Sequence, residues 1–111
     1  MSKVSSEVIC DAGPVIHLDE LDALDLLSDF AVIYLPEAVW EEIAAHRPQA
    51  HKHTQTNLSR VRVELTDDSV LWAFIRAFSL DKGEQEVIQL ARNFPDRILL
   101  NDDAAARLAA E

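Results

Sequence analysis

The sequence predicts an α/β fold built around a mainly parallel sheet. Short apolar runs that are typical of buried strands alternate with longer segments whose apolar residues recur at helical spacing. Two of these runs, residues 8–10 and 98–100, are followed closely by an aspartate, Asp11 and Asp102 respectively. Because parallel strands end at a common edge of their sheet, we expect both carboxylates at the edge where open α/β folds bind ligands.

The first half of the chain contains two expected strand–helix units. Ala12-Gly13-Pro14 interrupts the first strand, and residues 15–28 carry leucines at helical spacing, which predicts one or two helices. Residues 31–35 form a second apolar run, and Pro36 ends it. Since a proline suits the first turn of a helix, we expect a helix from Pro36 to about Ala45.

The second half begins with a polar loop and continues with alternating strands and helices. The apolar spacing predicts a half-exposed strand, a buried helix rich in aromatic residues, a second helix, a strand and a final helix. In order, we expect the loop at 46–57, the strand at 60–65, the buried helix at 68–79, the next helix at 84–93, the strand at 97–100 and the last helix from about Asp102.

Size and composition restrict the classes of protein to consider. A chain of 111 residues, of which 49% are hydrophobic, is long enough for one domain with a real core. Its formal net charge of −10 argues against a broad basic surface for nucleic acid. Cys10 is the single cysteine, so no intrachain disulfide can form, and no apolar stretch is long enough to cross a membrane. We therefore expect a soluble cytoplasmic protein.

Helical geometry selects two glutamates that could join Asp11 and Asp102. In the helix after Pro36, Glu42 lies at the border of the apolar stripe, whereas Glu41 points nearly opposite to it. In the helix at 84–93, Glu84 falls on the apolar face. A carboxylate in such a position needs a partner, a proton or a pocket, because an unpaired buried charge is costly.

Converging carboxylates favour a divalent cation. Four such groups without a neighbouring Lys or Arg would raise one another's pKa values unless a cation lay between them. Oxygen ligands without nearby Cys or His favour Mg²⁺ or Mn²⁺ over zinc. Such a site can orient phosphate oxygens and activate water, as in metal-dependent nucleases.

Four motifs, in order, are similar to those of the PIN-domain family, in particular its prokaryotic PIN-like subfamily of predicted nucleic-acid-binding proteins and VapC-type toxins. They cover essentially the whole chain. The motifs are the strand at 8–10 with Asp11-Ala12-Gly13-Pro14, then Pro36-x-x-Val39-x-x-Glu42, then Leu80-Asp81-x-Gly83-Glu84 with Ile88 and Leu90-Ala91, and finally Leu99-Leu100-Asn101-Asp102-Asp103 with Ala106-Arg107.

The resemblance implies a three-layer α/β/α fold and a Mg²⁺- or Mn²⁺-dependent endoribonuclease, often the toxin of a toxin–antitoxin pair. By position, Asp11, Glu42, Glu84 and Asp102 match the acidic quartet that would be catalytic. The metal ligands would be Asp11, Glu84 and Asp102, with Asp103 as an additional ligand. Asn101 matches a polar residue that would orient substrate or water.

The resemblance also implies binding partners and the limits of the domain. RNA would be the substrate, a cognate antitoxin would bind the acidic site, and the protein would form a homodimer with no membrane partner. Residues 1–111 would form a single PIN-like domain. Because members of the family usually continue into a further strand, we expect the C-terminal strand to be missing and the domain to be truncated.

Other interpretations remain open at this point. Asp11 and Asp102 could be helix caps or turn residues, which is a common role for aspartate. A PIN-like module without activity could serve as a protein-binding partner. A phosphoacceptor domain also places acids after strands, but no lysine follows a late strand in the position that such a domain needs.

Overall fold

The computed structural model describes residues 4–52, 56–66 and 69–101 of the protein. Strands and helices alternate through most of this part of the chain, as the apolar spacing predicted. The elements are β1 (Val4–Cys10), α1 (Ala12–Glu20), the 3₁₀ helix η1 (Leu24–Asp29), β2 (Phe30–Pro36), α2 (Glu37–His46), the short 3₁₀ helix η2 (Ala50–Lys52), β3 (Leu58–Val61), α3 (Ser69–Phe78), α4 (Lys82–Asn93) and β4 (Ile98–Leu100).

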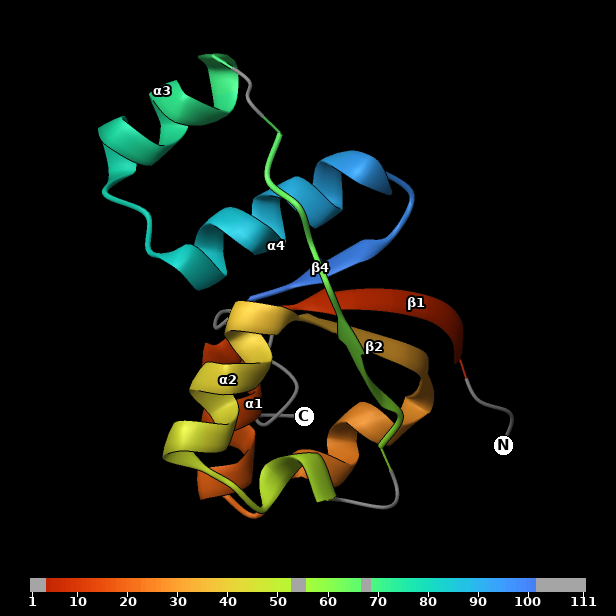
Figure 1. The fold of residues 1–111 in the computed structure, drawn as a ribbon. Helices are drawn as coiled ribbons and strands as arrows, with labels where there is room; N and C mark the ends of the chain where they lie inside the picture. Colours follow the sequence, from red (N-terminus) through yellow and green to blue (C-terminus); the bar gives the residue numbers. More distant parts are fainter. Residues whose placement is uncertain (1–3, 53–55, 67–68, 102–111) are drawn as a thin grey trace.

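The sheet has four strands, all parallel, in the order β3-β2-β1-β4. The chain winds from β1 through β2 to β3 and then returns past β1 to β4. Figure 1 shows α1 and α2 on one face of the sheet and α4 on the other, which is the predicted three-layer α/β/α arrangement. The direction of winding changes between β1 and β4, and open α/β sheets bind ligands at this kind of point.

The core lies around β1 and β2. Val8, Ile9 and Cys10 of β1 are fully buried, and so are Ile33 and Leu35 of β2. A strand buried on both faces reads as a continuous apolar run, and this explains why β1 was recognisable from sequence. Cys10 is a buried thiol outside any disulfide, and it packs in the core as a small apolar residue does.

Several helix and strand boundaries differ from those predicted. At the helix starts the reason is that a proline can lie at the N-cap or within the first turn of a helix. α1 begins at Ala12, so Pro14 lies inside its first turn, where a missing N–H does not matter. Pro36 is the N-cap of α2 and not its first helical residue. The third strand is β3 at Leu58–Val61, so the prediction of a strand at 60–65 was wrong in both limits.

The helix predicted at 68–79 is present as α3, but the prediction that it is buried was wrong. Val70 is 57% exposed, Trp72 is 50% exposed and Phe78 is 66% exposed. Figure 1 shows α3 beyond α4, away from the sheet, which explains the exposure. Apolar spacing identifies a helix with an apolar face, but it does not say whether another element covers that face.

No helix among the described residues is long and apolar enough to cross a membrane. The final helix expected from Asp102 lies outside the described residues.

Candidate functional site

Asp11 lies where β1 ends and α1 begins, at the carboxyl edge of the sheet. Cys10 pairs with Leu100 of β4, and the Asp11 N–H donates to the Leu100 carbonyl at 3.4 Å. Asn101, which is exposed, therefore follows β4 next to the position where Asp11 follows β1. The predicted meeting of the ends of these two strands is confirmed up to Asn101; Asp102 and Asp103 lie outside the described residues.

Asp11 also caps a helix. Its Oδ1 accepts a hydrogen bond from the Ala12 N–H at 2.8 Å, and its backbone is extended, as in an N-cap residue. The local interpretation of Asp11 as a cap is therefore correct. Capping leaves carboxylate lone pairs available, so it does not exclude a second role at the edge of the sheet.

Glu84 lies in the first turn of α4, next to an acid that we did not predict as part of the site. Asp81 is the N-cap of α4, and its Oδ1 accepts from the Glu84 N–H at 2.8 Å. This contact brings the two carboxyl groups together. An aspartate followed three residues later by a glutamate is a capping pattern, so the position of Asp81 was readable from sequence.

The start of α4 also lies against α2, the helix that carries Glu42. A side-chain carbon added at Gly83 would be 3.5 Å from Cγ2 of Val39 and 3.5 Å from the carboxylate of Asp81. Glu42 itself is exposed, at the border of the apolar face of α2. The close approach of the two helices places Glu42 on the same side of the sheet edge as Asp81 and Glu84.

The electrostatics of Glu42 and Glu84 show that the charges of Asp11 and Asp81 reach both glutamates. Desolvation raises the pKa of Glu42, and the charges of Asp81 and Asp11 raise it further, while His46 lowers it. Desolvation also raises the pKa of Glu84, with the same two aspartates adding to the effect and a hydrogen bond to the Asp81 carboxyl contributing. We call Asp11, Glu42, Asp81 and Glu84 the acidic cluster.

The acidic cluster suits a divalent cation in its chemistry. Its donors are carboxylate oxygens, and the charges of Asp11 and Asp81 make Glu42 and Glu84 harder to ionise, a repulsion that a cation would relieve. Within residues 4–52, 56–66 and 69–101, no three His, Cys, Asp or Glu side chains are close enough to hold a metal ion. Mg²⁺ often binds through only one or two carboxylates and retains water ligands, so the donor set fits this ion.

Two arginines of the described part of the chain are paired with carboxylates, Arg60 near the start of α2 and Arg47 at the opposite end of that helix. Arg60 forms an ion pair with Glu37 at the start of α2, and its guanidinium lies 5.7 Å from the centre of the Trp40 ring. Arg47 pairs with Asp19 at 2.7 Å. Both arginines are therefore already neutralised by carboxylates in this structure.

Two buried polar residues of α4 also escaped the sequence prediction. Glu86 is 4% exposed and Gln89 is 2% exposed. The predicted apolar face of this helix included Ile88 and Phe94, yet Phe94 is 44% exposed. Polar residues in a helix are ordinarily assigned to its solvent side, so only the tertiary contacts of these two side chains could reveal their burial.

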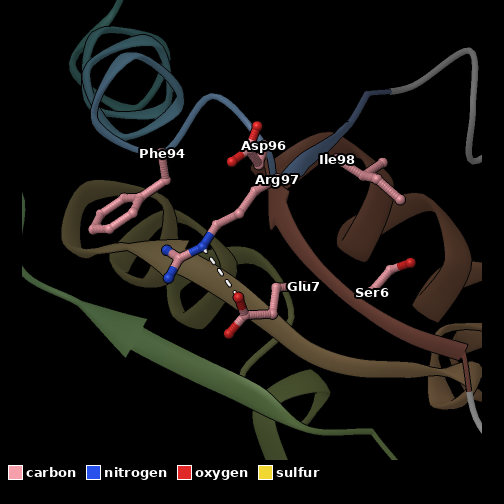
Figure 2. A pocket seen from close by; sticks show the side chains of 6 residues that line it. All are labelled: Ser6, Glu7, Phe94, Asp96, Arg97 and Ile98. Atoms are coloured by element: carbon pink, nitrogen blue, oxygen red, sulfur yellow. Dashed lines mark ion pairs between the residues drawn. The ribbon is translucent and has the colours of Figure 1, made fainter.

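A pocket of about 380 Å³ lies away from the acidic cluster, near the beginning of β4. Figure 2 shows the Arg97 side chain extending toward Glu7, with an ion-pair distance of 3.6 Å. The guanidinium also lies 4.1 Å from the ring centre of Tyr34 and 3.9 Å from that of Phe94. Glu7 and Arg97 of the lining thus already pair with each other, Asp96 is the third charged residue of the lining, and none of the lining residues is a predicted site residue.

A family model described as PIN domain matches residues 7–111, which is nearly the whole chain. No curated protein and no solved structure matches the chain.

Proposed function

The chain belongs to the PIN-domain family, whose members have a nuclease-type fold, and from this premise we propose that it is a Mg²⁺- or Mn²⁺-dependent endoribonuclease. The observation that carries the proposal is the acidic cluster at the carboxyl edge of the sheet, where the charges of Asp11 and Asp81 raise the pKa values of Glu42 and Glu84. That edge is where the fold binds ligands.

In this proposal Asp11 and Glu84, with Asp102 and Asp103, hold the ion, which supplies positive charge for the phosphate and helps to activate water. Asp81 orients the start of α4 and adds negative charge next to Glu84. Glu42, exposed and with a raised pKa, is suited to exchange a proton with the attacking water. Asn101 orients the substrate or the water.

The negative net charge makes the cation necessary for binding RNA. A chain with a formal charge of −10 repels phosphate, and the acidic cluster repels it locally. A divalent ion held by the cluster would make the local charge positive at the place where the phosphate must bind. The proposal therefore predicts that RNA binds to the metal-loaded protein much more tightly than to the metal-free protein.

The family resemblance extends the proposal to a biological role. We propose that the protein acts as the toxin of a toxin–antitoxin pair in the cytoplasm. In that role it forms a homodimer, and a cognate antitoxin binds the acidic cluster. Basic side chains of such a partner would replace the cation as the source of positive charge.

A second candidate is a PIN-like protein-binding module without catalytic activity. The observation that favours it is α3, whose Val70, Trp72 and Phe78 side chains are exposed and apolar. Exposed apolar surface of this kind is typical of protein interaction sites. In this alternative the acidic cluster would serve only to cap helices and to bind basic side chains.

Cleavage of RNA in Mg²⁺, in Mn²⁺ and in EDTA separates the two candidates. We expect the wild-type protein to cut cellular RNA with either metal and to be inactive in EDTA. Asp11→Asn keeps the cap, because asparagine caps as well as aspartate, but it removes a charged ligand, so we expect at least a 100-fold loss of rate.

Asp25→Asn is the matched control, because Asp25 is an exposed aspartate on η1, outside the acidic cluster. This variant should cleave RNA at the wild-type rate. Cleavage that persists in EDTA or in Asp11→Asn would contradict the metal-dependent mechanism. Absence of cleavage in every condition would favour the protein-binding module.

A further inference from the structure

Glu86 is a buried carboxylate with a long-range partner. It lies in α4, its residue is 4% exposed, and its Oε1 accepts a hydrogen bond from the Ala38 N–H of α2 at 2.9 Å. The two residues are 48 positions apart in the chain. Burial of a charged group is unfavourable without a partner, so this contact is what makes the position of Glu86 tolerable.

The start of α2 explains why such a partner is needed. The first N–H groups of a helix have no acceptor within the helix, and a side chain at the N-cap usually supplies one. The N-cap of α2 is Pro36, which makes no side-chain cap hydrogen bond. Glu86 supplies the missing acceptor from α4, and its negative charge suits the positive end of the α2 dipole.

The hydrogen bond lies between two members of the acidic cluster. Ala38 is one helical turn before Glu42 on α2, and Glu86 is two residues after Glu84 on α4. The contact therefore joins the two helices close to both acids. It lies near Gly83, where an added side-chain carbon would be 3.5 Å from Val39 of α2.

We propose that Glu86 is a positioning residue, which fixes the separation of Glu42 and Glu84 by holding the start of α2 against α4. The inference rests on the proposed function, because the separation matters only if the acidic cluster binds a metal and cleaves RNA. Without the hydrogen bond, α2 and α4 can move relative to each other. Glu84, a proposed ligand of the ion, and Glu42, the proposed proton-exchanging group, would then be found less often in the arrangement that binds the ion and cleaves RNA.

Gln89 provides a matched control on the same helix. It is 2% exposed, and its Oε1 accepts from the backbone N–H and the hydroxyl of Thr66, at 3.2 and 2.9 Å. Its amide donates to Asn93 at 3.0 Å. Gln89 is thus as buried as Glu86 and also bonds a distant segment, but that segment carries no member of the acidic cluster.

The experiment compares Glu86→Ala, Glu86→Gln and Gln89→Ala with the wild type. The measurements are melting temperature, Mn²⁺ affinity by calorimetry, RNA cleavage resolved into kcat and KM, and hydrogen exchange of the Ala38 amide. All binding and cleavage is measured well below the lowest melting temperature. Glutamine keeps an acceptor oxygen of the same shape, so Glu86→Gln tests whether the hydrogen bond is sufficient.

We expect Glu86→Ala to weaken Mn²⁺ binding and to lower kcat, each by about tenfold or more, with little change in KM. The Ala38 amide should lose protection from exchange. Glu86→Gln should recover most of both losses. Gln89→Ala should lower the melting temperature by a similar amount but leave Mn²⁺ affinity and kcat within about twofold of the wild type.

The inference is wrong if Glu86→Ala and Gln89→Ala lose Mn²⁺ affinity equally, or if Glu86→Ala only lowers the melting temperature. Should Glu86→Ala fail to fold, the inference rests on Glu86→Gln, and an unprotected Ala38 amide together with wild-type Mn²⁺ affinity and kcat in that folded variant would overturn it. A wild-type protein that neither binds Mn²⁺ nor cleaves RNA would instead overturn the proposed function. The wild-type measurement therefore distinguishes the two failures.

Discussion

At the scale of single residues, the acids of this protein combine structural and chemical roles. Asp11 and Asp81 are both N-caps, and both also raise the pKa values of Glu42 and Glu84. A cap requires an acceptor oxygen but not a charge, whereas a cation site requires the charge. Amide substitutions separate the two requirements, because asparagine accepts the same hydrogen bond without the charge.

In the absence of metal, substitutions of Asp81 separate its capping hydrogen bond from the effect of its charge. Asp81→Asn keeps the cap on the Glu84 N–H and removes repulsion, so we expect it to match or slightly exceed the wild-type stability at pH 7 in EDTA. Asp81→Ala loses the cap and should cost about 1 kcal/mol. Urea denaturation measures both. Equal losses in the two variants would show that the charge of Asp81 is not repelled in the folded protein.

The raised pKa of Glu84 predicts how stability depends on pH. A carboxyl whose pKa is higher in the folded state than its ordinary 4.5 releases its proton more readily when unfolded. Its contribution therefore lowers the free energy of unfolding as pH rises from about 4.5 through the folded-state pKa. Below 4.5 both states are protonated and the contribution vanishes.

We expect Glu84→Gln to lose less stability than the wild type between pH 4.5 and pH 7, with EDTA present throughout. Urea denaturation at both pH values measures the difference. Glu20→Gln is the control, because Glu20 is exposed and lies outside the acidic cluster, at the end of α1. A wild-type pH dependence in Glu84→Gln would show that Glu84 titrates normally.

At the scale of elements, α3 and α4 illustrate two uses of an apolar helix face. α4 contributes Val87 and Leu90 to the core, and both are at most 5% exposed. In α3, the side chains of Val70, Trp72 and Phe78 are instead exposed. Burial on folding is what stabilises an apolar side chain, so the same residue types contribute differently in the two helices.

Paired substitutions test this difference. Leu90→Ala should lower the free energy of unfolding by about 2–5 kcal/mol, because it leaves a cavity in the core. Phe78→Ser should change it by no more than about 0.5 kcal/mol, because the side chain already meets solvent. Urea denaturation at low protein concentration measures both. A loss above about 2 kcal/mol for Phe78→Ser would mean that another surface covers α3 in solution.

At the scale of the whole molecule, the net charge of −10 makes stability dependent on ions. Salt screens repulsion among carboxylates, so NaCl should raise the melting temperature modestly. MgCl₂ at equal ionic strength should raise it further, because a specifically bound ion stabilises the folded state by mass action. Thermal denaturation measures the excess, and Asp11→Asn should abolish it. Equal effects of the two salts would indicate screening alone.

The sequence was sufficient for much of the fold, since β1, β2, α2 and the parallel order of β1 and β4 follow from short apolar runs, prolines and helical spacing. Asp11, Glu42 and Glu84 were selected from sequence as site residues, and in the structure the charge of Asp11 raises the pKa of both glutamates. Whether these residues are catalytic, and whether Asp102 and Asp103 join them, stays a prediction.

Tertiary packing decided the rest. Periodicity describes one helix at a time, so it could place Glu84 on an apolar face but could not show that Glu86 reaches across to Ala38. The same limit applies to α3, whose apolar face looks like that of a core helix until the positions of α4 and the sheet are known. Local spacing dictates which side chains share a face, whereas burial and pairing depend on what another part of the chain places against that face.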